Sequence, residues 1–345
     1  MFNKKYVPII AIWETTLACN MKCIHCGSSA GKVRLKELST KEAIGLCKDL
    51  NELGTELVTL MGGEPFLRKD WFQISQEIKD LGMDLTFISN GSTIDNEKIS
   101  KLIKLEPYAV AVSLDGGIPE THDSIRGLKG SFEKCLYCLE LLKKSGISTS
   151  VITTLHKKNV KELFMIRELL LNKEIAWQIQ MAGPSGRFPK ELMLSEEEFY
   201  SVAMFISSSR NQYSTKQLPI MGAHNFGYHS HVLGNLMISP IWKGCLAGIS
   251  NIGIQSDGGI KGCLSLPDNF IEGNIRRKSL KDIWNSPNFA SYNRKFKRKD
   301  LNAYCKSCKY GVSCKGGCAT VSTLLTEKLH SNPYCLYRIE KEKMN

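Results

Sequence analysis

The chain has 345 residues, of which 42% are hydrophobic and 23% are charged, and its formal net charge is +12. This composition is that of a globular protein without low-complexity segments, which excludes disordered and collagen-like classes. The basic surplus is scattered and is densest at residues 294–299, so we interpret it as a solvated surface, with an acidic partner as the alternative and neither nucleic acid nor a membrane as a partner.

The N-terminal residues give no sign of export. The apolar run at residues 7–13 ends at Glu14, and it is too short for a signal peptide or a membrane span. We therefore expect a cytoplasmic protein, in which the 13 cysteines stay reduced and cluster as metal ligands rather than form disulfides.

Short apolar runs alternate with amphipathic segments from residue 8 onward. Strands are predicted at residues 8–16, 57–63, 85–91, 108–116, 147–155 and 175–183, and helices at residues 40–53, 71–81, 96–105, 131–145 and 160–171. Regular alternation predicts parallel βα units with buried strands. Six units fit either an open doubly wound sheet or a partial barrel, and in both the functional residues gather at the carboxyl ends of the strands.

Thiol and polar residues follow the first four predicted strands. They are Cys19, Cys23 and Cys26, then GGEP at residues 62–65, SNG at residues 89–91 and SLDG at residues 113–116. Because the ends of parallel strands share one edge of a sheet, we expect these four loops to converge on one mouth.

Three closely spaced thiolates can hold three irons of a [4Fe–4S] cube and leave the fourth iron open to a small molecule. A structural zinc site is the alternative, but it closes with four ligands. The only nearby fourth candidate is His25, which lies inside the same tight turn.

Cys-x3-Cys-x2-Cys followed in order by GGEP, SNG and SLDG loops resembles the radical S-adenosylmethionine (SAM) superfamily. The resemblance implies a partial (βα)6 TIM-like barrel of the α/β class. It also implies that the open iron chelates SAM and that an electron from the cluster cleaves SAM to a 5′-deoxyadenosyl radical, which abstracts a substrate hydrogen.

The residue types suit these roles. Gly62 and Gly63 let the backbone approach the methionine moiety of SAM, and Glu64 offers an acceptor to its ammonium group. Asn90, Ser113 and Asp115 are short polar groups that reach a carboxylate or the ribose hydroxyls, although each alone also fits a turn former or cap. By resemblance, Arg126 lies near the SAM carboxylate, while Met181 and His25 flank the adenine.

A second cysteine block resembles the SPASM extension of radical SAM enzymes, which carries two auxiliary [4Fe–4S] clusters. The block consists of Cys245, Cys263, Cys305, Cys308, Cys314, Cys318 and Cys335. Residues 251–255 and 260–263 are the predicted arms of a hairpin around Gly258 and Gly259.

The resemblance assigns Cys305, Cys308, Cys314 and Cys335 to a distal cluster, and Cys245, Cys263 and Cys318 to a proximal one. The proximal set is one ligand short, because no cysteine lies between Cys245 and Cys263. The fourth iron there is then open to substrate or to an unidentified ligand. A zinc ribbon of Cys305, Cys308, Cys314 and Cys318 is the alternative, but it leaves three cysteines unexplained.

Three further cysteines and one histidine-rich stretch remain. Cys47, Cys135 and Cys138 lie on amphipathic helices and are predicted core residues, with a redox pair of the last two as the alternative. Residues 221–231 contain three histidines, which line a substrate pocket, supply the missing ligand, or belong to a polar loop over the barrel mouth.

We expect a barrel core at residues 1–185, a connecting segment at 186–240 and the auxiliary-cluster domain at 241–345. Relatives with this extension mostly modify peptides, and this favours peptide or protein maturation. Formylglycine formation is disfavoured because Leu264 stands where that branch carries an aspartate.

No leader-binding domain precedes the first predicted strand, which keeps an alternative alive: radical modification of a small molecule or cofactor, such as a tetrapyrrole side chain. Expected partners are the substrate, a reducing protein such as flavodoxin or ferredoxin, and a separate leader-binding protein. A non-enzymatic electron carrier is the remaining interpretation, and the four SAM loops argue against it.

Overall fold

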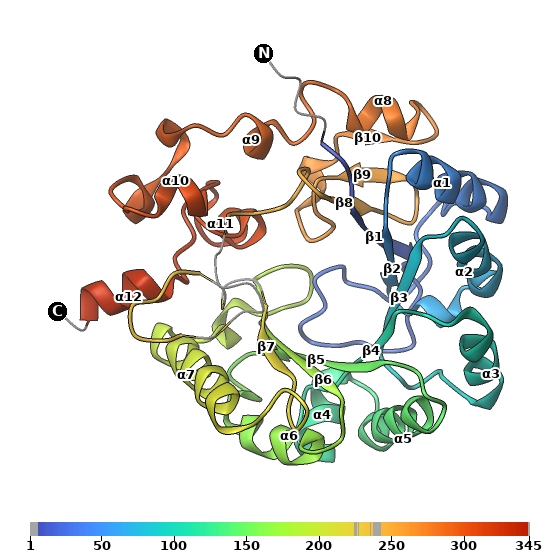
Figure 1. Cartoon of the computed structure of the whole chain (residues 1–345), viewed down its shortest axis with the longest axis horizontal. Helices are drawn as coiled ribbons and strands as arrows, with labels where there is room; N and C mark the ends of the chain where they lie inside the picture. Colours follow the sequence, from blue (N-terminus) through green and yellow to red (C-terminus); the bar gives the residue numbers. More distant parts are fainter. Residues whose placement is uncertain (1–5, 224–225, 227, 235, 237–242, 344–345) are drawn as a thin grey trace.

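The computed structural model describes residues 6–223, 226, 228–234, 236 and 243–343. One curved, mostly parallel sheet forms its centre, with strand order β10-β9-β8-β1-β2-β3-β4-β5-β6-β7 and helices along its outer face (Figure 1). The α/β class with parallel βα units, expected from the alternating pattern, is confirmed, and the curved sheet agrees with the partial barrel that the family resemblance implies.

Strands β1 to β7 are parallel to their neighbours, and so are β8 and β1. The strands are β1 (Ile10–Thr16), β2 (Leu57–Gly62), β3 (Asp84–Ser89), β4 (Ala109–Ser113), β5 (Thr149–Leu155), β6 (Ala176–Met181), β7 (Ile220–Gly222), β8 (Asn251–Ile254), β9 (Gly259–Lys261) and β10 (Gly273–Asn274).

The helices of the barrel carry their apolar residues on one face. They are α1 (Thr40–Glu52), α2 (Trp71–Asp80), α3 (Asn96–Leu105), α4 (Pro119–Arg126), α5 (Ser131–Lys144), α6 (Leu163–Leu170) and α7 (Glu196–Gln212). Helix α1 begins with a capping box in which Ser39 and Glu42 satisfy each other's backbone N–H groups, and Ser195 and Glu198 do the same for α7.

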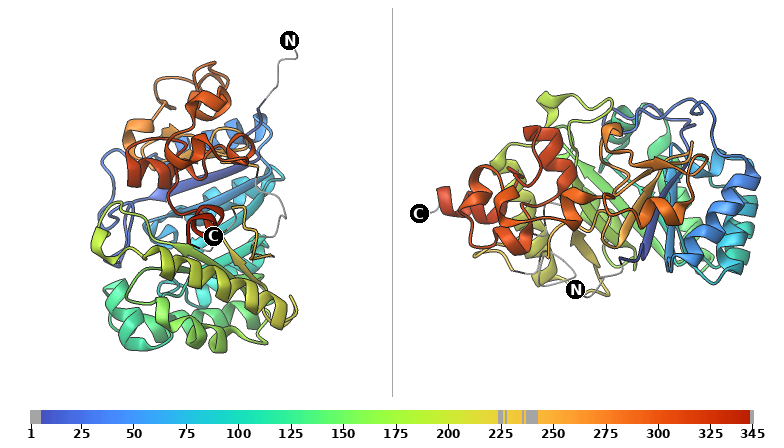
Figure 2. Two further views of the ribbon diagram at one scale, coloured as in Figure 1. Left: turned by 90° about the vertical axis from the view of Figure 1, so that its left-hand side faces the viewer. Right: turned by 90° about the horizontal axis from the view of Figure 1, so that it is seen from above.

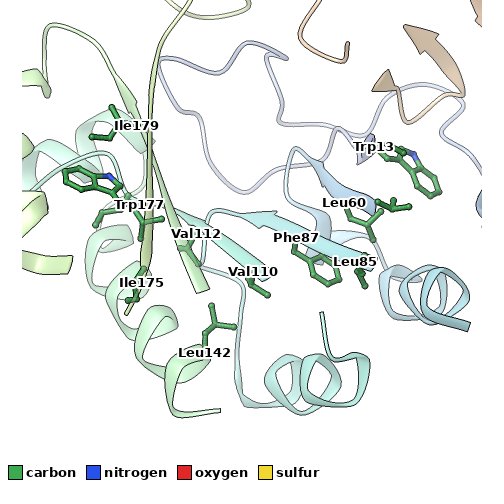
Figure 3. Packing of buried hydrophobic residues seen from close by; sticks show 14 of the residues in the cluster. Trp13, Leu60, Leu85, Phe87, Val110, Val112, Leu142, Ile175, Trp177 and Ile179 are labelled. Carbon is green, nitrogen blue, oxygen red and sulfur yellow. The ribbon is translucent and has the colours of Figure 1, made fainter. Parts of the chain in front are cut away.

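The core lies between the sheet and these helices (Figure 3). Trp13, Phe87, Val110 and Trp177 come from four different strands, and each is 0% exposed. The indole N–H of Trp177 donates to Thr153 Oγ1 at 2.8 Å, so this large ring is buried without an unpaired donor. Such a core holds the strand ends in fixed positions for the loops that follow them.

The C-terminal part continues the sheet and then becomes a chain of short helices. These are α8 (Leu280–Trp284), α9 (Ser291–Arg294), α10 (Gly311–Cys314), α11 (Ala319–Thr326) and α12 (Leu336–Lys343). Helices α10, α11 and α12 gather at one end of the molecule (Figure 2), and α12 packs beside α7, where Tyr200 donates to Glu340. Helix α8 packs against α1.

The predicted hairpin forms, with β8 and β9 as antiparallel arms and Gly258 at φ +88° in its turn. Its placement was not predicted. Strand β8 pairs in parallel with β1, and Ser256 at the hairpin turn donates to Glu14 Oε1 at 2.9 Å. The auxiliary-cluster segment is therefore joined directly to the strand that leads into the first cysteine block.

Helix α4 and strand β7 are among the elements that were not expected. Helix α4 has eight residues and buries Ile125 as its single aliphatic residue, so its sequence shows no clear apolar period. Strand β7 has only three residues and lies in the predicted connecting segment. Among the described residues, no helix is long and apolar enough to cross a membrane.

Candidate active site

The loop that carries the first three cysteines follows β1, and backbone hydrogen bonds join its two ends. We call this loop the cysteine hoop. Cys19 N donates to Gly31 O at 3.0 Å, and Gly31 N donates to Leu17 O at 3.0 Å. Arg187 also fixes this loop, because its guanidinium donates to Cys23 O at 3.1 Å and to Ala30 O at 2.6 Å. Sequence reasoning missed Arg187, because its partners lie some 160 residues earlier and no local pattern marks it.

Each of the three thiols has an N–H group nearby. Met21 N lies 3.4 Å from Cys19 Sγ, Arg126 Nη1 lies 3.6 Å from Cys23 Sγ, and Ala30 N lies 3.3 Å from Cys26 Sγ. Such donors stabilise negatively charged sulfur. Burial raises the pKa of the Cys19 thiol to about 11, so a metal must supply the positive charge that favours its thiolate. The donor set therefore fits an iron–sulfur cluster.

Gly62 and Gly63 are required by the close approach of two backbones. A Cβ on Gly62 would stand 2.2 Å from Thr16 O, and a Cβ on Gly63 would stand 2.1 Å from Ala18 O. Gly62 also has a φ of +142°, in the region that favours glycine. The GGEP loop can thus lie directly against the chain that leads into Cys19, and the predicted approach to SAM stays a prediction.

Glu64 is 0% exposed and joins the GGEP loop to the SNG loop. Its carboxylate accepts from Ser89 Oγ at 2.9 Å, from Asn90 N at 2.8 Å and from Thr93 Oγ1 at 3.2 Å. Burial raises its pKa, although these hydrogen bonds oppose the shift. In this structure Glu64 orders the two loops, and its predicted contact with the SAM ammonium is not tested.

Asn90 links the SNG loop to the cysteine hoop. Its amide Nδ2 donates to Asn20 Oδ1 at 2.9 Å and lies 4.0 Å from Cys19 Sγ. Its Oδ1 accepts from Ser92 N at 2.9 Å. The side chain predicted to reach SAM is therefore fixed beside the first cluster cysteine.

Asp115 is fully buried and joins three elements. Arg126 Nη2 lies 2.7 Å from its Oδ2, His25 Nε2 lies 3.3 Å from the same oxygen, and Thr154 N donates to its Oδ1 at 2.8 Å. Burial alone would raise the pKa of Asp115, but Arg126 and His25 outweigh it and hold the pKa below its ordinary value. Burial lowers the pKa of His25 to about 4 despite Asp115, so His25 is neutral at pH 7 and its contact with Asp115 is not an ion pair.

Arg126 reaches both this carboxylate and the cluster cysteine Cys23, and it is only 7% exposed. In the structure, the positive charge of Arg126, which was predicted to lie near the SAM carboxylate, thus forms an ion pair with Asp115. Ser113 and Met181 end β4 and β6. The carbonyl of Ser113 lies 3.5 Å from Cys135 Sγ, and Met181 packs against Ala182, Phe188 and Met193.

Two residues after β5 were missed. Asn159 Nδ2 donates to Asp115 O at 2.9 Å, and its Oδ1 accepts from His156 N at 2.9 Å. The ring of His156 lies 5.8 Å from those of His25 and Phe188, and its buried Nε2 has no partner. A His-x2-Asn spacing after a predicted strand was the available signal.

We expect stability to fall with acid because of His122 on α4, which is 0% exposed. Burial and Arg126 lower its pKa to about 4, and its Nδ1 accepts from Asp115 N at 3.2 Å. Because the folded-state pKa lies below the unfolded one, the unfolded chain binds the proton first, and stability is lost as the pH falls from about 6.5 towards 4.

The test is urea unfolding at pH 7 and pH 5 for the wild type and for His122→Gln, which keeps an acceptor and removes the titration. The wild type should lose about 2 kcal/mol more than the variant over this range. Equal losses would contradict the prediction.

The seven cysteines of the second block fall into two sets. Cys305, Cys308, Cys314 and Cys335 line one pocket together with Tyr304, Tyr310 and Tyr337. Four thiols around one cavity are the donor set of a closed [4Fe–4S] cube. Burial raises the pKa of Cys314 to about 12, and the other three thiols add to the shift.

Cys245, Cys263 and Cys318 form the second set. Burial raises the pKa of Cys245 to about 12, and Cys318 and Cys263 raise it further. These thiols come from the segment before β8, from the end of the hairpin and from the start of α11. The grouping into four and three is the one that we assigned from the family pattern, although no bound metal tests it. Among the described residues, no three His, Cys, Asp or Glu side chains form a site for a single metal ion.

The histidine-rich stretch lies near the four-cysteine set rather than the three-cysteine set. His229 stacks on Tyr310 with ring centroids 3.9 Å apart, and His231 lies 4.8 Å from Tyr337. His224 falls outside the described residues. Cys47, Cys135 and Cys138 are each 0% exposed in the core, as predicted.

A partial barrel with a three-cysteine loop at its mouth and a cysteine-rich extension defines a radical enzyme with auxiliary clusters. A profile of the radical SAM superfamily matches residues 13–170, and a profile of the SPASM iron–sulfur cluster-binding domain matches residues 245–309. The chain belongs to the radical SAM superfamily and carries a SPASM domain.

The relatives are synthases and maturases. An AdoMet-dependent heme synthase from Methanosarcina barkeri is 29% identical over 97% of this chain and 98% of its own. The mycofactocin maturase MftC from Mycobacterium ulcerans is 30% identical over 90% of this chain and 83% of its own. SuiB from Streptococcus suis, solved with its precursor peptide SuiA, has a TM-score of 0.77 at 16% identity and covers 96% of this chain and 76% of its own.

At 16% identity, the similarity to SuiB shows the fold alone. The two family profiles and the synthase and maturase relatives show that the chain is an enzyme that uses a [4Fe–4S] cluster with SAM and auxiliary iron–sulfur clusters, as expected from the sequence.

Proposed function

We propose that this enzyme modifies a tetrapyrrole by abstracting hydrogen from one of its side chains. The observation that carries the proposal is the end-to-end similarity to a heme synthase, which spans 97% of this chain and 98% of the relative. The sequence pattern favoured a peptide substrate, but the match to the heme synthase is more complete than those to MftC and SuiB, of which the chain covers 83% and 76%.

Modification of a peptide is the second candidate. It is supported by the 30% identity to a mycofactocin maturase over 90% of this chain. A separate leader-binding protein belongs to this candidate alone.

When bound, SAM and its cluster supply the 5′-deoxyadenosyl radical. We assign Cys19, Cys23 and Cys26 to that cluster. We propose that Asn90 and Arg126, which lie 4.0 Å from Cys19 Sγ and 3.6 Å from Cys23 Sγ, orient polar groups of SAM while Arg126 keeps its ion pair with Asp115. The side chains of His25 and His156 approach each other beside Asp115 and flank the adenine in this proposal, with Met181.

We assign the four-cysteine set to the distal cluster and the three-cysteine set to the proximal cluster. Hydrogen abstraction leaves a radical on the substrate. Oxidation of that radical releases one electron, which the auxiliary clusters, held by these cysteines, would accept. A reducing protein such as flavodoxin or ferredoxin is the proposed electron donor, and free thiols at all thirteen cysteines suit the cytoplasm.

The decisive experiment uses the anaerobically reconstituted enzyme with SAM, dithionite and an iron porphyrin whose propionate side chains are all intact. We expect the porphyrin to bind, as seen by its absorption shift, to increase 5′-deoxyadenosine release, and to lose mass at a side chain. A precursor peptide encoded beside this gene is the matched alternative substrate. Turnover of the peptide without any response to the porphyrin would reverse the order of the two candidates.

A further inference from the structure

The three-cysteine set supplies three of the four ligands that a [4Fe–4S] cluster can take. A buried hydroxyl lies close to Cys263, which is one of the three. Tyr292 Oη belongs to the buried polar atoms of the described residues that have no hydrogen-bond partner. A buried hydroxyl without a partner costs free energy unless something fills its bonding capacity. We therefore asked what stands in front of it.

The position of Tyr292 is fixed by the segments that carry the cysteines. The next residue, Asn293, donates from Nδ2 to Cys245 O and to Ala247 O, both at 2.7 Å. The Tyr292 carbonyl lies 3.0 Å from His330 Nε2. The backbone at residues 292–293 is thus clamped between the Cys245 segment and the C-terminal part.

The Tyr292 hydroxyl reaches the segment that carries Cys263. Gly262 immediately precedes Cys263, and a Cβ on Gly262 would stand 2.5 Å from Tyr292 Oη. Any side chain at residue 262 would displace the hydroxyl. The hydroxyl therefore lies against the residue that precedes Cys263, while the neighbouring Asn293 holds the carbonyl of Cys245.

Three other residues with possible ligand atoms have partners of their own. Tyr228 Oη accepts from Cys318 N and, at 2.8 Å, from Asn332 Nδ2. His229 and His231 pack against Tyr310 and Tyr337 near the four-cysteine set. Among the described residues, no ring contact or hydrogen bond joins His229 or His231 to the three-cysteine set.

We propose that Tyr292 is the fourth ligand of the proximal cluster and binds its remaining iron through the phenolate oxygen. The O–H bond breaks on binding, the proton leaves to solvent, and an Fe–O bond forms without a change of redox state. Tyrosine oxygen is an established iron ligand in haem proteins. The proposal rests on the assignment of Cys245, Cys263 and Cys318 to one cluster, and it replaces an open iron with a closed site.

The test uses the full chain with Cys19→Ala, Cys23→Ala and Cys26→Ala, so that the auxiliary clusters alone contribute about eight irons. In this background Tyr292→Phe should lose about one iron per chain and show the electron paramagnetic resonance signal of an oxidised [3Fe–4S] cluster. Tyr304→Phe is the matched control, since Tyr304 lines the four-cysteine pocket, and it should keep all its iron.

Resonance Raman spectra of the parent protein should contain iron-bound tyrosinate bands that Tyr292→Phe lacks. Full iron content with unchanged spectra in Tyr292→Phe overturns the proposal. Cys245→Ala separates the two assumptions. If it leaves the cluster intact, the cysteine assignment itself is wrong, whatever Tyr292 does.

Discussion

Replacing Cys19, Cys23 and Cys26 together by alanine will abolish the release of 5′-deoxyadenosine from SAM under reducing conditions. The three thiols stand on a hoop that Gly31 closes and Arg187 fastens. No other cysteine stands on this hoop, so nothing nearby can replace the lost iron ligands. The measurement is 5′-deoxyadenosine by liquid chromatography after incubation with SAM and dithionite.

The matched control is Cys47→Ala, which removes a thiol that is 0% exposed in the core. The triple variant should lose about four irons per chain, whereas the control should lose none. Cleavage of SAM by the triple variant at the rate of the wild type would disprove the assignment of the catalytic cluster.

Asp115→Asn will destabilise the protein by about 3–5 kcal/mol, because it leaves the charge of a buried arginine uncompensated. Arg126 Nη2 lies 2.7 Å from Asp115 Oδ2, and the two side chains are 8% and 0% exposed. The measurement is the free energy of urea unfolding at pH 7. Since the pKa of Asp115 lies below its ordinary value, this stabilisation is present at neutral pH and is lost as the pH falls through the folded-state pKa.

A second substitution separates charge from shape. Asp115→Leu with Arg126→Met removes both charges and should recover most of the lost stability, while SAM cleavage stays impaired because Arg126 no longer lies beside Cys23. Asp95→Asn is the surface control. Its side chain is 59% exposed and caps α3, and it should change stability by less than about 1 kcal/mol. A loss of less than about 1 kcal/mol for Asp115→Asn would show that the ion pair does not hold the site together.

The barrel could be predicted because its signals are local. The apolar faces that predict helices at residues 40–53 and 71–81 recur every three or four residues, and the helices end at Glu52 and Asp80. Helix α4 escaped because its eight residues begin with Pro119 and bury one aliphatic side chain. The attachment of β8 to β1 escaped because register between strands 240 residues apart leaves no trace in either strand alone.

The sequence by itself determined the class of chemistry. The spacing of thiols within a single loop decides whether they can share one cluster. The three-cysteine block is one such loop, and the GGEP, SNG and SLDG motifs are equally short stretches of the sequence. Tertiary structure decided what surrounds each thiol. Arg187 reaches Cys23 O across 164 positions, and Arg126 reaches Cys23 Sγ across 103.

The same division holds for the second block. Seven cysteines could be counted and compared with a family pattern, but only the fold brings Tyr292 against Gly262, next to Cys263, and Asn293 against the carbonyl of Cys245. The physical reason is that the neighbours of a metal ligand are set by chain packing between distant segments, which no local spacing encodes.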